Sequence, residues 1–83
     1  MTHRRRFSSD EVVSALLRAG FEARRKPKGS HLTLTKLRPD GRGHYTATVV
    51  LGRHEIKDPT LDGILEQAHL SYEELLEFAK VKK

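Results

Sequence analysis

Two different periods of apolar and polar positions run along this chain, and they divide it into helices and strands. Near the start, one helix face is formed by apolar residues at the i, i+4 spacing: Val12, Val13, Leu16 and Leu17. Ser8 and Glu11 in front of them make a capping-box pattern, and Gly20 supplies the stop. The pattern predicts a first helix over residues 8–20.

A two-residue period, typical of strands, follows in three stretches. The predicted strands are residues 21–26, 31–37 and 45–51. In the first, Phe21 and Ala23 lie on one side. In the second, Leu32 and Leu34 face the core, which leaves His31 on the opposite face with the threonines. In the third strand the core face is expected to carry Tyr45, Ala47, Val49 and Leu51.

The helical period returns in the last third of the chain. Asp58 is predicted to cap a helix that has Pro59 at its first position, with an apolar face of Leu61, Ile64, Leu65 and Ala68. Gly63 weakens this helix, and we expect it to allow close packing. Ser71 and Glu74 form a second capping box, which predicts a last helix running to the C-terminus.

The order α-β-β-β-α-α predicts an α+β fold in which helices cover one face of a three-stranded antiparallel sheet. The other face, rich in threonine and basic residues, is expected to stay open to solvent. The chain of 83 residues allows a single domain spanning residues 1–83 with a small core, and residues 1–7 are expected to form a flexible basic arm.

Charge changes the picture because it is unevenly distributed. Residues 1–57 carry 13 Lys and Arg against 5 Asp and Glu, whereas residues 58–83 carry 3 against 6. A net charge of +5 with this asymmetry favours a polyanionic partner, most simply nucleic acid. The absence of cysteine excludes a disulfide framework and thiolate chemistry. With no signal-like or membrane-length apolar run, a soluble protein of the cytoplasm is expected.

His31 is the first candidate for chemistry. A run of basic residues precedes it, and neighbouring cations favour the neutral imidazole that can act as a base. RNA supplies its own nucleophile, the 2′-hydroxyl, so a base beside cations is enough to cleave its backbone without a metal. Gly29 gives the backbone freedom near a phosphate, and Ser30 can donate to phosphate oxygens. The alternative, which composition and spacing alone favour, is that His31 is an ordinary exposed strand-edge residue.

A second group of residues could support that chemistry. His54, after the third predicted strand, could serve as the complementary acid or bind phosphate, or be a plain loop histidine. The candidate phosphate contacts are Arg24, Lys26, Lys28, Lys36, Arg38, Arg42, Arg53 and Lys57. No histidine spacing supports a metal site, and stacking platforms for single-strand readers are sparse.

Several motifs resemble one known family. Lys28-Gly29-Ser30-His31 at the mouth of a strand is similar to the Gly-Ser-His signature of the HicA toxin family, the ribonuclease half of HicA–HicB toxin–antitoxin pairs. Gly20-Phe21 resembles the family's Gly–aromatic pair. The family's second-helix stretch is similar to Lys57 to Leu61, Ile64-Leu65 and Gln67-Ala68, and the tail found in many members is similar to residues 70–75. The resemblance covers roughly residues 8–78, and the joint occurrence is much more specific than Gly-Ser-His alone.

The resemblance implies a fold like the double-stranded-RNA-binding domain, with an extra C-terminal helix. It also implies a metal-independent endoribonuclease that cleaves mRNA, uses His31 as its catalytic residue, needs no cofactor and is neutralised by a HicB-type antitoxin.

The chain departs from the family pattern at several positions. No aromatic residue follows His31 closely, and Leu51-Gly52 precedes the second histidine region, where the family commonly has proline. Pro59 and His69 stand where the family usually has glycine.

Two other functions are compatible with the same residues. The first is a non-catalytic RNA-binding module that uses the basic open face of the sheet. The second is an interaction protein whose apolar and acidic C-terminal helices recruit a partner, while the basic half is merely solvated.

Overall fold

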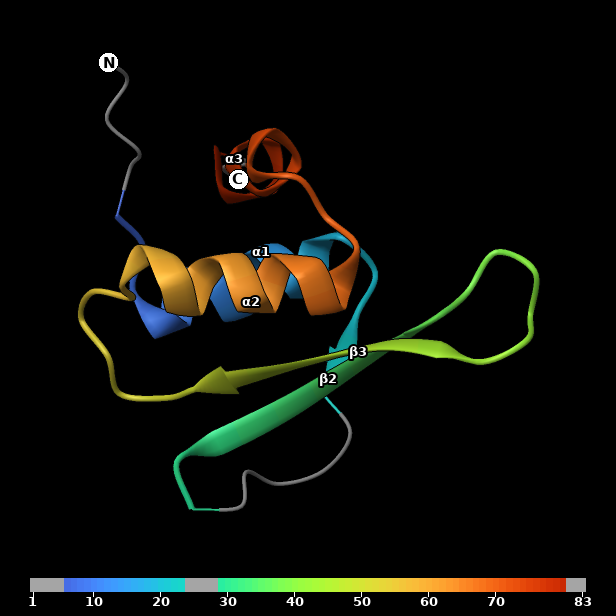
Figure 1. The fold of residues 1–83 in the computed structure, drawn as a ribbon, viewed down its shortest axis with the longest axis horizontal. Coiled ribbons are helices and arrows are strands. Elements are labelled where there is room, and N and C mark those ends of the chain that lie inside the picture. Colours follow the sequence, from blue (N-terminus) through green and yellow to red (C-terminus); the bar gives the residue numbers. More distant parts are fainter. Residues whose placement is uncertain (1–5, 24–28, 81–83) are drawn as a thin grey trace.

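The computed structural model describes residues 6–23 and 29–80 and confirms the predicted α+β class (Figure 1). The described elements follow in the predicted order: α1 (Ser9–Arg18), β1 (Glu22–Ala23), β2 (His31–Leu37), β3 (His44–Val50), α2 (Asp58–Ala68) and α3 (Tyr72–Lys80). α1 and α2 lie on one side of the β2–β3 pair, and α3 packs on α1 (Figure 1).

The sheet is antiparallel with the strand order β1-β2-β3. Its register fixes which side chains share a face, because alternate residues of a strand point to opposite sides. Leu32 pairs with Val49 and Leu34 with Ala47, and all four are buried under the helices. The residues between them point away from the helices, as the alternation predicted.

Local signals in the sequence set both ends of α1. The Ser8 side chain accepts from the Glu11 backbone N–H, and the Glu11 carboxylate accepts from the Ser8 N–H, so the capping box is complete. At the other end, Gly20 takes a φ of 102°, which only glycine adopts without strain. The Phe21 N–H then reaches back to the Leu16 carbonyl at 3.0 Å, which closes the last turn.

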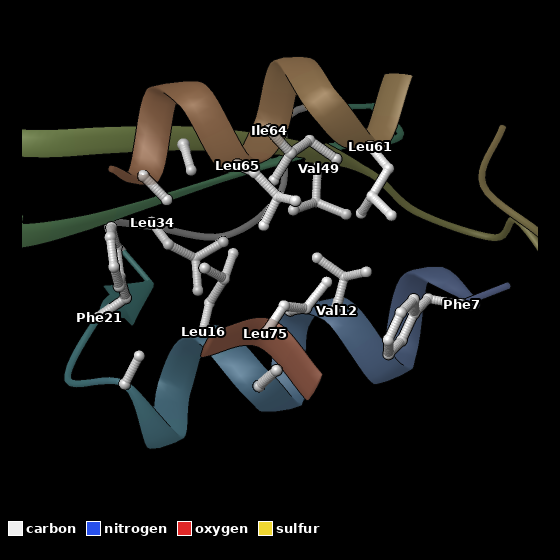
Figure 2. Packing of buried hydrophobic residues seen from close by; sticks show 14 of the residues in the cluster. Phe7, Val12, Leu16, Phe21, Leu34, Val49, Leu61, Ile64, Leu65 and Leu75 are labelled. Carbon is white, nitrogen blue, oxygen red and sulfur yellow. The ribbon is translucent and has the colours of Figure 1, made fainter. Parts of the chain in front are cut away.

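The core lies between the helices and the covered face of the sheet (Figure 2). Its fully buried side chains come from every large element, among them Val12, Leu16, Leu34, Val49, Leu61 and Leu75. α3 also begins at its predicted capping box, since the Ser71 and Glu74 side chains each accept from the other's backbone N–H. The amphipathic patterns therefore predicted these core residues, but Leu17, which they placed on the apolar face of the first helix, is 48% exposed.

Phe7 corrects the expectation of a basic arm over residues 1–7. Its ring has no exposed surface and meets the Tyr72 ring edge to face at 6.2 Å. Its carbonyl accepts from the Ile56 N–H at 2.8 Å. A buried aromatic ring outweighs the entropy of ordering this segment, so Phe7 belongs to the core. Residues 1–5 lie outside the described residues.

The first predicted strand, residues 21–26, is described only in part: β1 is Glu22–Ala23, both residues are exposed, and residues 24–26 lie outside the described residues. Two smaller expectations were wrong. Asp58 is already inside α2, whose N-cap is Lys57 with no side-chain hydrogen bond; Asp58 instead adds negative charge to the first turn. Gly63 makes no close contact, since a Cβ there would meet nothing within 4 Å.

Candidate functional site

His31 is the first residue of β2 and lies on the open face of the sheet, as predicted. Its side chain is exposed, and its partner across the ladder is Val50, the last residue of β3. Thr33 and Thr48 continue the same face, with their hydroxyl oxygens 3.4 Å apart. The His31 ring makes no hydrogen bond within the described part of the chain, so it is free to meet a ligand.

The backbone before His31 is held in place even though its side chains are exposed. Gly29 has a φ of 64°, in the left-handed region, and forms the turn that leads into β2. The Ser30 carbonyl accepts from the Leu51 N–H at 2.6 Å, which extends the ladder by one bond. The Ser30 hydroxyl and His31 therefore sit at the end of a paired strand.

His54 lies in the segment between β3 and α2, and its side chain is exposed. This segment is tied to α1 through Ser9, a residue that sequence reasoning did not single out. The Ser9 N–H donates to the Arg53 carbonyl at 2.9 Å, and the Arg53 N–H donates to Ser9 Oγ at 3.0 Å. Ser9 Oγ in turn donates to the Val50 carbonyl at 2.5 Å. Ser9 thus joins the start of α1 to the strand end opposite His31.

The sequence did contain a signal for Ser9. It stands three residues before Val12 and seven before Leu16, on the apolar face of the first helix. A small polar residue at such a position must find hydrogen-bond partners, and Ser9 is 1% exposed.

A pocket of about 230 Å³ opens beside this end of the sheet, between the end of β3 and the first half of α2. Two of the predicted phosphate contacts, Arg53 and Lys57, line it. Val50 also lines it, so the pocket and His31 adjoin the same strand end. All of its lining residues lie between positions 50 and 64, but the local patterns did not predict that the strand end, the loop after it and the first half of α2 would enclose a pocket.

The other predicted cations are distributed over the molecule. Lys36 lies five residues along β2 from His31, roughly 17 Å away, on the helix-covered face with its ammonium 5.9 Å from the Phe21 ring centre. Arg38 follows the end of β2, 5.1 Å from the Tyr45 ring, which stacks on His69 at 4.3 Å. Arg42 is exposed in the β2–β3 loop. Arg24, Lys26 and Lys28 lie outside the described residues.

In residues 6–23 and 29–80, no three His, Cys, Asp or Glu side chains come together in a group that could hold a metal ion. No helix in the same ranges is long and apolar enough to cross a membrane.

The fold and the site define a class: a small basic α+β domain with a histidine exposed at the mouth of its central strand. A model of the HicA toxin family, described as the HicA toxin of bacterial toxin–antitoxin, matches residues 9–70. The chain belongs to the HicA toxin family and is a toxin of a toxin–antitoxin system, which implies an antitoxin partner. A search of curated proteins gave no match.

Proposed function

We propose that this toxin is a metal-independent endoribonuclease that cleaves mRNA with His31 as its catalytic acid and base. The observation that carries the proposal is the position of His31: exposed at the strand mouth, beside a pocket that Arg53 and Lys57 line. The cationic character of the first 57 residues supports RNA as the substrate. The family's role as a toxin is consistent with destruction of mRNA in the cytoplasm.

In the proposed reaction, His31 takes the proton of an RNA 2′-hydroxyl. The 2′-oxygen forms a bond to the adjacent phosphorus while the bond from phosphorus to the 5′-oxygen breaks. The leaving 5′-oxygen takes a proton from His54, so the products are a 2′,3′-cyclic phosphate and a new 5′-hydroxyl end. Arg53 and Lys57 offset the charge that builds up on the phosphate oxygens, and Ser30 and the backbone at Gly29 hold the phosphate.

The first test compares cleavage of a long mRNA by the wild type and by His31→Ala, with EDTA present throughout. We expect the variant to lose about 10²–10⁴-fold in rate, as removal of a general base does, while its fold and RNA affinity are retained. His44→Ala is the matched control, because His44 is an exposed histidine at the far end of the same sheet. Equal cleavage by wild type and His31→Ala would show that His31 is not catalytic.

His54 is proposed as the acid that protonates the leaving 5′-oxygen. We expect His54→Ala to slow cleavage of ordinary RNA but not of RNA whose scissile 5′-oxygen is replaced by sulfur, since a thiolate leaves without a proton. The cleavage rates of His54→Ala and wild type on the two substrates show whether His54 supplies the proton to the leaving oxygen. If both slow equally, His54 acts by binding phosphate or by supporting the loop.

The antitoxin partner is proposed to be of the HicB type and to cover His31. We expect such an antitoxin to stop RNA cleavage and to shield His31 from modification by diethyl pyrocarbonate, with His44 left reactive as the internal reference. Continued modification of His31 in the inhibited complex would place the antitoxin elsewhere.

The comparison of wild type with His31→Ala also distinguishes a ribonuclease from the alternative function, a non-catalytic RNA-binding module. It predicts salt-sensitive binding and intact RNA with both the wild type and His31→Ala.

A further inference from the structure

The pocket beside β3 combines an apolar wall with cationic groups. Val50, Ile56 and Ile64 supply the apolar surface, and Ile56 and Ile64 are each 4% exposed, so their side chains are fixed by the core. The lining is completed by Arg53, Glu55, Lys57 and Thr60. An apolar wall with a few charged and hydrogen-bonding groups is the usual composition of a small-molecule site.

The charges of this lining favour an anion. Glu55 is paired with Arg6 at 2.5 Å, so its negative charge is offset. Neither Arg53 nor Lys57 has a carboxylate partner within the described part of the chain. The two cations are therefore available for a phosphate, for which lysine and arginine are the common protein ligands.

The pocket also lies within reach of the proposed cleavage site. Val50 lines it and is the direct ladder partner of His31, and such partners have Cα atoms about 4.5–5.5 Å apart. Its volume of about 230 Å³ is below the roughly 300 Å³ at which drug-sized sites begin, which suits a single nucleotide base better than a larger ligand.

We propose that this pocket receives one nucleotide of the RNA substrate, next to the phosphate that is cleaved. The base lies against Ile56 and Ile64, and its phosphate lies between Arg53 and Lys57. This inference rests on the proposed function and adds to it a source of sequence preference. A pocket of fixed shape discriminates among bases, so cleavage should favour one base, or one size class of base, at a position adjacent to the cut.

The first experiment needs no cleavage. The four nucleoside 3′-monophosphates are titrated into the wild-type protein, and NMR signals of the amides and methyl groups are followed. We expect the largest shifts at Val50, Ile56 and Ile64, with unequal affinities for the four bases. Thr60→Phe fills the pocket without changing charge, and we expect it to weaken binding at least about tenfold. The control Ser14→Phe introduces the same ring at an exposed position of α1 and should bind like the wild type.

The second experiment maps the bases flanking the cuts in a long mRNA made by the wild type, Thr60→Phe and Ser14→Phe. We expect the base preference of the wild type and Ser14→Phe to be lost or changed in Thr60→Phe. Nucleotide shifts that avoid the pocket, or an unchanged preference in Thr60→Phe, would overturn the inference while leaving the ribonuclease proposal intact. Nucleotide binding in the pocket of a protein that leaves mRNA uncut would instead overturn the ribonuclease proposal alone.

Discussion

At the scale of single residues, Ser9 is the one polar residue of the described ranges that is buried. It is 1% exposed, and its hydroxyl both donates to the Val50 carbonyl and accepts from the Arg53 N–H. The two hydrogen bonds connect Ser9 to residues that lie 41 and 44 positions later in the chain. Ser9 therefore positions the strand end opposite His31 and the start of the segment that carries His54.

Replacing this hydroxyl should be costly. We expect Ser9→Ala to lower the free energy of unfolding by about 1–3 kcal/mol, because it leaves a part-buried N–H and a part-buried carbonyl without their partner. Ser14→Ala, an exposed serine on the same helix, should change it by less than about 0.5 kcal/mol. Urea unfolding of both variants makes the comparison. Equal stability of the two variants would mean that water or a backbone shift replaces the Ser9 hydroxyl.

At the scale of elements, α2 is the helix that covers the free edge of the sheet. It packs against β3, and the Gln67 side chain accepts from the Thr48 N–H at 3.2 Å. β3 is an edge strand, and a strand edge with unpaired N–H groups invites pairing with another chain. α2 thus protects part of this edge while its first half forms one wall of the pocket.

Gly63 is a weak point of α2. Because it is exposed, helical and free of contacts at the Cβ position, we expect Gly63→Ala to raise the free energy of unfolding by about 0.5–1 kcal/mol. Gly29→Ala is the matched control with the opposite sign, since its φ of 64° strains any residue with a Cβ. Thermal unfolding should show a higher Tm for the first variant and a lower Tm for the second. A fall in Tm for Gly63→Ala would point to a contact of α2 that requires glycine.

At the scale of the whole molecule, four of the candidate phosphate contacts in the described ranges are divided between two ends of the sheet. Arg53 and Lys57 line the pocket near His31, whereas Lys36 and Arg38 lie toward the other end and contact Phe21 and Tyr45. The excess positive charge attracts RNA as a whole, but only cations near the cleaved phosphate can contact it.

This division predicts the salt dependence of binding. With uncleaved RNA in the His31→Ala background, we expect Lys57→Gln to reduce the slope of log affinity against log salt by about 0.7, the value for one phosphate contact on a single strand. Lys36→Gln removes the same charge and should leave the slope nearly unchanged. Fluorescence anisotropy of labelled RNA over a salt series measures both. Equal losses would mean that net charge, and not position, determines binding.

The sequence by itself determined the order of elements, the capping boxes of α1 and α3, and the face on which His31 lies. These features depend on neighbours within about four residues along a helix or on alternation along a strand, so they can be predicted from the local periodicity of the sequence. The sequence also predicted His31 and His54 as candidate site residues, and the structure shows both side chains exposed; their roles in catalysis stay predictions.

Only the tertiary structure decided which distant segments meet. It buried Phe7 against Tyr72, brought the Lys36 ammonium to 5.9 Å from the Phe21 ring centre, and joined Ser9 to Val50 and Arg53. It also began α2 at Asp58 and not after it. The physical reason is that burial and long-range hydrogen bonds depend on how the whole chain packs. The periodicity of a local stretch does not indicate which distant residues it will contact.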